Sequence, residues 1–178
     1  MLATKDLMNE HQLILKYIDL MERYISHANT AILFDKAYSF ITFIHEFADD
    51  FHHAKEEDIL FRYLEVPGVL THCNPIPQMF LEHNKARELV EAMEKALLIN
   101  NLSALVTAMT EYGQLLKEHI YKENNILYPM AERGLSEAAK TSLLIDYAEA
   151  DKRLNSAGIW QTYQTLYTEL VDYLNTVG

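Results

Sequence analysis

Hydrophobic side chains recur every three or four positions along most of this chain, a spacing typical of amphipathic α-helices. Four such stretches are separated by short segments rich in Asn, Pro and Gly, such as Pro67-Gly68 and Asn100-Asn101. Short connections place successive helices side by side in opposite directions. The pattern therefore predicts an all-α protein, with an up-down-up-down four-helix bundle over residues 1–133.

Residues 134–178 continue the helical pattern beyond the predicted bundle. Ser136 can begin one helix, Ala157-Gly158 can separate it from another, and the second carries an aromatic stripe that includes Tyr163 and Tyr167. We expect these additional C-terminal helices to form an extension packed on the bundle. The alternative is that their aromatic stripe forms the interface of a homodimer.

Composition narrows the class of protein. The chain has 178 residues, the size of one domain, and 49% of them are hydrophobic, which is enough for a packed core. The formal net charge of −11 argues against nucleic acid as a partner, because phosphate binding needs clustered Lys and Arg. Cys73 is the only cysteine and cannot form an internal disulfide. Neither a signal-peptide pattern nor a long apolar run occurs, so we expect a cytoplasmic protein without a membrane partner.

A repeated motif carries most of the candidate chemistry. The spacing His-x-x-Lys-Glu-x-x-Ile-Leu-aromatic begins at His52 and again at His119, and in each copy the histidine and glutamate share one helical face. A Glu-His pair lies one predicted helix before each copy. The duplicated unit thus supplies four imidazoles and two carboxylates, His11, His52, Glu56, His83, His119 and Glu123.

The six residues are expected to lie at one depth of the bundle. In both hairpins the histidine of each helix is about 16 or 17 residues from the connecting loop, or roughly 25 Å along the helix. One histidine on an apolar stripe is usually a hydrogen-bonded core residue. Six polar groups buried at one level would cost several kcal/mol without a metal ion, so the pattern predicts a metal site.

A competing register is offered by His53 and Glu57, which are also four residues apart. The helical row that contains them runs back through acidic, solvent-type residues, whereas the row of His52 and Glu56 runs through apolar ones. We therefore choose His52 and Glu56 as ligands. His53 and Glu57 are expected on the flank of the site or in its outer shell.

The same rows predict which residues face the core around the ligands. His45 and Tyr112 precede the ligand histidines at matching positions, and we expect a buried hydrogen-bonded pair, or else part of a proton or ligand path. Beyond the glutamates, the rows are expected to continue inward through Ile59, Tyr63 and Ile126.

The residue set Glu10-His11, His52-His53-x-Lys-Glu-Glu, Glu82-His83 and His119-x-x-x-Glu123 resembles the hemerythrin-like, or HHE cation-binding, proteins. The resemblance implies two non-haem iron ions, bridged by oxo or hydroxo and by carboxylate groups, in a four-helix bundle. It also implies that the four histidines are terminal ligands and that the two glutamates are bridges. Imidazole and carboxylate suit Zn or Mn as well.

One position departs from the oxygen-carrying hemerythrins, which have another histidine four residues after the ligand of the third helix. Arg87 stands there in this chain, either beside the metal-facing row or paired with Glu91. The departure favours a protein that binds or senses small ligands such as O2 or NO. The alternatives are an enzyme that reacts with peroxide, O2 or NO, and a protein of iron-centre repair or iron handling.

Overall fold

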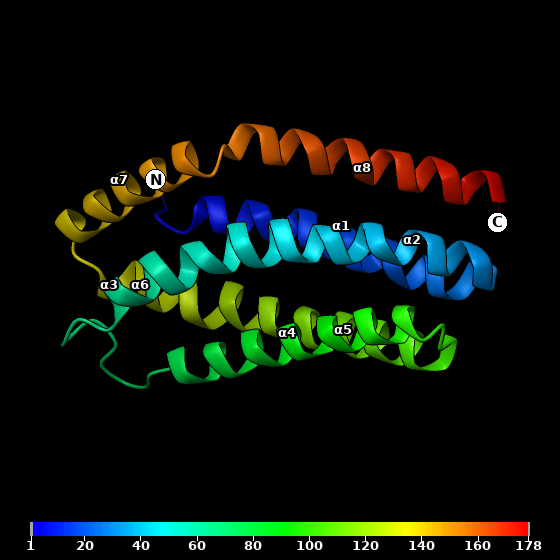
Figure 1. Cartoon of the computed structure of the whole chain (residues 1–178). Helices are drawn as coiled ribbons and strands as arrows, with labels where there is room; N and C mark the ends of the chain where they lie inside the picture. The colour runs from blue at the N-terminus through cyan, green and yellow to red at the C-terminus, as the bar shows by residue number, and fades with distance from the viewer. Residues whose placement is uncertain (1, 178) are drawn as a thin grey trace.

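A computed structural model describes residues 2–177, and all the elements assigned within that range are helices, which confirms the all-α class (Figure 1). The elements are α1 (Lys5–His27), α2 (Thr30–Phe43), η1 (Ile44–His53), η2 (Glu56–Leu60), α3 (Phe61–Leu64), α4 (Ile76–Leu98), α5 (Leu102–Lys122), η3 (Glu123–Leu127), α6 (Tyr128–Gly134), α7 (Glu137–Arg153) and α8 (Ser156–Val177). The η segments are π-helical turns that continue the α-helices on either side of them. The elements α2 to α3 therefore form one rod and α5 to α6 another, which together with α1 and α4 make the four-helix bundle (Figure 1).

Asparagine side chains start two of the rods. Asn29 accepts a hydrogen bond from the backbone N–H of Ile32, and Asn101 accepts one from Ala104. Such caps satisfy backbone donors that the first helical turn leaves free. Thr4 makes no comparable side-chain cap before α1; instead its backbone N–H and its hydroxyl donate to Glu132 in α6. The N-terminal end of α1 is thereby tied to the end of the fourth rod.

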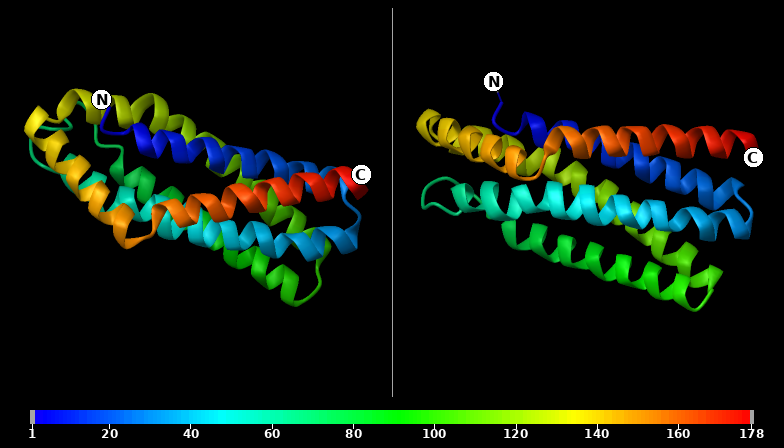
Figure 2. Two further views of the ribbon diagram at one scale, coloured as in Figure 1. Left: turned by 90° about the horizontal axis from the view of Figure 1, so that it is seen from above. Right: turned by 45° about the horizontal axis from the view of Figure 1, so that its top comes forward.

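The C-terminal helices lie along the bundle, with α8 beside α1 (Figure 2). The hydroxyls of Tyr17 and Tyr24 in α1 donate to the carbonyls of Tyr163 and Leu170 in α8, each at 2.7 Å. Tyr147 of α7 packs into the core on the other side of the polar layer described below. The aromatic stripe thus contacts the chain's own bundle, and a homodimer through these helices stays a prediction.

The π-helical turns change which side chains face the core. Each such turn contains an extra residue, so the buried face after it is rotated relative to an uninterrupted α-helix. After Glu123, Leu127 and Tyr128 are buried, whereas Ile126, which we expected to face inward, is 45% exposed. After Glu56 the fully buried residues are Leu60, Phe61 and Leu64. Ile59 and Tyr63, which we expected to face inward, are only partly buried at the edge of the same cluster.

The expected pair of His45 and Tyr112 is not formed. The side chain of His45 is 48% exposed and its Nε2 lies 3.0 Å from Glu94 Oε1. Tyr112 is buried, and its hydroxyl has no hydrogen-bond partner among the described residues. The π-helical segment η1, which begins at Ile44, turns His45 away from the inner row.

Two apolar clusters fill the bundle on either side of a layer of polar residues. One cluster contains Leu7, Phe61 and Met79, and the other contains Ile14, Phe47 and Val90. His11 and His83 lie between these positions along α1 and α4, so the polar layer crosses the bundle. Within the described part of the chain, none of the helices has the length and hydropathy needed to cross a membrane.

Candidate metal centre

The structure brings all six predicted ligands together in the polar layer. Together with His53 they form two groups of potential donors that share Glu56, and within each group the donor atoms lie within 4.8 Å of one another. Every member is buried. The first group is His11, His52, Glu56 and Glu123, and the second is His53, Glu56, His83 and His119.

Carboxylates connect the two groups. Glu123 Oε2 lies 3.1 Å from His11 Nε2, while its Oε1 lies 3.1 Å from His119 Nε2. Glu56 Oε2 lies 3.7 Å from His52 Nε2 and 3.5 Å from His83 Nε2. Each glutamate therefore reaches imidazoles of both groups, which is the arrangement that two bridging carboxylates require.

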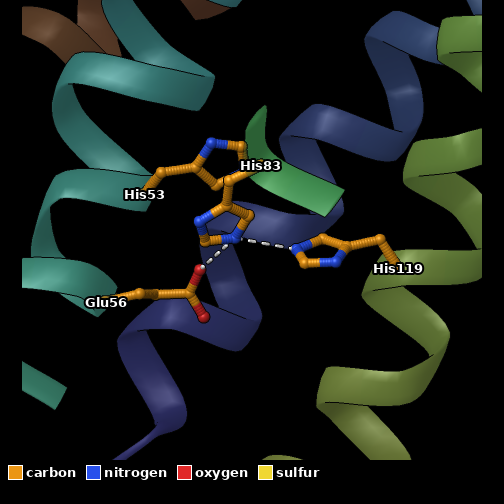
Figure 3. A group of neighbouring side chains, drawn as sticks. All are labelled: His53, Glu56, His83 and His119. Atoms are coloured by element: carbon orange, nitrogen blue, oxygen red, sulfur yellow. Dashed lines mark hydrogen bonds and ion pairs between the residues drawn. The ribbon is translucent and has the colours of Figure 1, made fainter. Parts of the chain in front are cut away.

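In the second group the imidazole nitrogens converge. His83 Nε2 lies 3.0 Å from His119 Nε2, and Figure 3 shows both rings turned towards the carboxylate of Glu56. The ring of His53 stacks on that of His83, with 3.8 Å between centroids and an interplanar angle of 15°. His53 thus lies inside the site, whereas the sequence reasoning placed it on the flank.

The position of His53 follows from the π-helix. In a regular α-helix, two adjacent residues point about 100° apart, so the choice of one as ligand excluded the other. The wider turns of η1 and η2 place both His52 and His53 in the layer, one on each group. One feature of the sequence could have identified His53 as a ligand, namely that two consecutive histidines precede Glu56.

All five imidazoles have an oxygen atom beside Nδ1, which leaves Nε2 to face the interior of the site. Four of the oxygens belong to side chains of another rod, and the fifth, from Asp49, lies four residues before His53 in the same segment. The distances from Nδ1 range from 2.6 to 3.2 Å. The pairs are His11–Asn124, His52–Glu10, His53–Asp49, His83–Glu57 and His119–Glu82.

Two lysines complete this outer layer, and each forms the same lysine–glutamate pair in its copy of the motif. Lys55 bonds Glu10, and Lys122 bonds Glu82. Each pair unites the glutamate of a Glu-His pair with the lysine of the repeated motif. The repeated positions of Glu and Lys in the sequence were the signal for these contacts, which the sequence reasoning did not use.

The two lysine-glutamate pairs differ in their exposure to solvent. Lys55 is 3% exposed, lies over the ring of Phe51 and also contacts Asp151 of α7, whereas Lys122 is 33% exposed. Burial raises the pKa of Glu10, and Lys55 offsets only part of that effect. Burial would also raise the pKa of Glu82, but hydrogen bonds from His119 and Lys122 lower it to about 2.

Arg87 organises the side of the site that holds His53 and His83. Its Nη2 lies 2.7 Å from Asp49 Oδ1 and 2.8 Å from Glu57 Oε1. These carboxylates are the Nδ1 partners of His53 and His83. Arg87 therefore lies beside the metal-facing row and acts on the ligands through their partners. It bonds Asp49 and Glu57 in place of the alternative partner, Glu91.

The interior atoms of the site show what it can hold. His52 Nε2, Glu56 Oε2 and both oxygens of Glu123 are buried without a hydrogen bond among the described residues. His11 lies near Glu123, but the contact lacks hydrogen-bond alignment. A buried carboxylate left in this state costs several kcal/mol. Imidazole nitrogens and carboxylate oxygens are ligands of first-row metals, so these residues fit a binuclear metal site.

Protonation would oppose metal binding at part of this site. Burial lowers the pKa of His52 to about 3, so its imidazole is neutral at physiological pH. Burial would lower the pKa of His119 too, but the carboxylates of Glu123 and Glu82 raise it to about 9 in the absence of metal. A metal ion must therefore displace a proton from His119 at neutral pH.

Comparison with known proteins agrees with this site. A family model described as the hemerythrin HHE cation binding domain matches residues 2–131, which include both groups of donors. The iron-sulfur cluster repair protein YtfE of Escherichia coli O81 (strain ED1a) is 33% identical over 105 residues, which are 53% of this chain and 46% of that protein. YtfE of Escherichia fergusonii is 32% identical over the same shares. The match thus spans about half the length of these relatives, and no solved structure matches the chain.

Proposed function

This chain belongs to the hemerythrin HHE cation-binding family, and from that premise we propose that it is a non-haem di-iron protein that binds or senses a small ligand such as O2 or NO. The observation that carries the proposal is the pair of buried donor groups that share Glu56 and contain carboxylate oxygens with no hydrogen bond from the described residues. Two cations would satisfy those oxygens and separate the facing imidazole nitrogens.

The number of donors supports a pair of ions with vacant positions. Five imidazoles and the four oxygens of two carboxylates give nine donor atoms. Two octahedral ions have about twelve coordination positions in total. About three positions therefore remain for solvent and a small ligand, and iron at those positions would supply redox chemistry and ligand binding.

The donor set favours iron over zinc. Structural zinc sites are closed by four ligands in tetrahedral geometry. Here three imidazoles and a shared glutamate already form the second group, and Glu123 Oε1 lies 3.1 Å from one of those imidazoles. Five donors around one position suit an ion that accepts six ligands, and the family membership points to iron.

The surrounding residues restrict access to the site. Apolar clusters cover the polar layer from both sides, and each of the six predicted ligands is nearly inaccessible to solvent. A low-polarity enclosure of this kind admits a small neutral molecule more readily than a charged substrate. This enclosure is the reason for preferring O2 or NO to a larger substrate.

Anaerobic loading with Fe(II) tests the proposal. We expect two iron ions per chain, followed by stoichiometric binding of NO to the ferrous protein as monitored by absorption. A single ion, or none, would rule out the binuclear site. Consumption of many equivalents of O2, NO or peroxide per chain would instead show an enzyme.

A second function is suggested by the relatives, which are named as iron-sulfur cluster repair proteins. Under this alternative, the same ions are delivered to a damaged cluster and do not serve as a permanent ligand site. Incubation of the iron-loaded chain with an iron-sulfur protein that has lost its cluster distinguishes the two. Transfer of iron, followed by recovery of the cluster, would favour repair over sensing.

A further inference from the structure

We propose that the hydroxyl oxygen of Tyr128 is a further donor to the metal ion held by His11 and His52, an inference that rests on the proposed iron site. The hydroxyl lies 2.7 Å from Glu56 Oε1 and 3.3 Å from His11 Nε2. Neighbouring donors of one octahedral ion with bonds of about 2.1 Å lie about 3 Å apart. The hydroxyl is therefore placed as a neighbour of two ligands of that ion.

The two donor groups differ in their number of imidazoles, and the hydroxyl of Tyr128 lies beside the group that has fewer. One group contains three imidazoles, from His53, His83 and His119, and the other contains only two. Both groups have access to the two glutamates. The hydroxyl of Tyr128 lies on the group with fewer imidazoles, where it would make the number of protein donors equal.

The internal repeat separates the role of the hydroxyl from that of the ring. Tyr128 occupies the position in the second copy that Phe61 occupies in the first. The ring of Tyr128 stacks on His11 with 5.4 Å between centroids, and the ring of Phe61 stacks on His83 with 6.0 Å. A phenyl ring is thus sufficient for this packing, so the buried hydroxyl is the feature that needs a separate explanation.

Ligation by tyrosine involves loss of the phenolic proton. Ligation to iron(III) would break the O–H bond of Tyr128 and form an oxygen–iron(III) bond. The proton would pass to the buffer, and no electron would be transferred in this step. In the structure the hydroxyl carries its proton, because it donates a hydrogen bond to Glu56 Oε1.

Visible absorption and resonance Raman spectra of the ferric protein test this inference. The full chain is loaded with Fe(II) without oxygen, its iron is counted, and it is oxidised with ferricyanide. We expect a visible phenolate-to-iron(III) band that enhances tyrosine ring vibrations, and we expect Tyr128→Phe to keep both ions and lose the band. Tyr147→Phe is the matched control, because that buried hydroxyl lies in the same cluster without a hydrogen-bond partner in the described chain.

The wild-type spectrum alone can overturn the inference. Wild-type protein with two ferric ions and no tyrosine vibrations would show that Tyr128 only donates a hydrogen bond to Glu56, and the di-iron proposal would stand. Tyrosine vibrations that persist in Tyr128→Phe would assign them to another residue. Wild-type protein without two ions would refute the iron site and this inference together.

Discussion

Replacement of His53 distinguishes two ligand sets: the set in the structure, which includes His53, and the set expected for a regular α-helix, which does not. His53 provides one of three imidazoles in its group, and Asp49 holds its Nδ1 so that Nε2 faces inward. His53→Ala would leave two imidazoles and the shared carboxylates for one ion. Loss of residues in the outer shell of a metal site already lowers affinity about 10–100-fold, so we expect at least about 100-fold here, or roughly 3 kcal/mol.

The loss should fall on one of the two ions. His11 and His52 belong to the other group, and the substitution leaves both of them in place. His53→Ala should therefore bind one ferrous ion with nearly native affinity and the other weakly. His53→Ile gives a second measure, because Ile120 occupies the matching position in the second copy and fills the space with an apolar side chain.

Competition with a ferrous chelator under anaerobic conditions measures both affinities. His45→Ala is the matched control, because His45 lies in the same π-helical segment but is half-exposed and contacts Glu94. We expect the control to bind two ions with native affinities. If His53→Ala bound both ions within about threefold of the native affinities, less than 1 kcal/mol, His53 would not be a ligand.

Three further predictions concern the outer layer and protonation. Lys55→Met should lower the free energy of unfolding in urea by about 3–5 kcal/mol, because it leaves the buried carboxylate of Glu10 bonded to His52 but without its cationic partner. Lys122→Met, at a site one-third exposed, should cost much less, and equal losses would contradict this reasoning. Arg87→Lys keeps the charge but not the fork that joins Asp49 to Glu57, so the affinity of the three-imidazole position should fall about tenfold in the chelator assay, with the other position unchanged. The pKa of His119 is raised from 6.5 to about 9, so its contribution to the stability of metal-free protein is present below pH 6.5 and is lost as the pH rises through about 9. Iron affinity should increase over the same pH interval, because the proton that competes with the metal ion for His119 is lost. Thermal unfolding as a function of pH measures the stability trend when a chelator is present and the affinity trend when iron is present, and the absence of either trend would contradict the prediction.

The sequence was sufficient for the fold class and for bringing six donors to one layer, because both depend on periodicities that tolerate local error. His52 and Glu56 are four residues apart, and this spacing keeps two side chains on one side of either an α-helix or a π-helix. The inward row beyond Glu123 was wrong at Ile126, and the row beyond Glu56 reached only partly buried positions, because each row assumed an uninterrupted α-helix. A π-helical turn depends on the packing of the whole layer, so hydrophobic spacing within one segment does not reveal it.

The contacts of Arg87 could not be predicted for a different reason. A guanidinium on a helix has many possible partners, and the sequence reasoning considered only the metals and Glu91 on the same helix. Asp49 lies 38 residues away along the chain and reaches Arg87 only through the antiparallel placement of two rods. Such a contact depends on the relative rotation of both rods, and in one of them η1 changes that rotation.

Three of the five differences between the two copies of the ten-residue motif lie at the metal centre. Positions 53 and 120 hold His and Ile, positions 57 and 124 hold Glu and Asn, and positions 61 and 128 hold Phe and Tyr. Each of these three differences alters a contact of a candidate ligand: a third imidazole, the Nδ1 partner of an imidazole, and a hydroxyl beside Glu56. The other two differences, Ala54 against Tyr121 and Asp58 against Asn125, lie towards the surface. The shared Lys and Glu positions preserve the frame that holds the imidazoles.

A duplicated bundle that keeps this frame therefore presents two chemically different metal positions, one rich in imidazole with a charged outer layer and one with fewer imidazoles beside a phenol. Ligand binding at such a pair should be asymmetric, with the small ligand entering at the ion of His11 and His52, where the protein supplies fewer nitrogen donors.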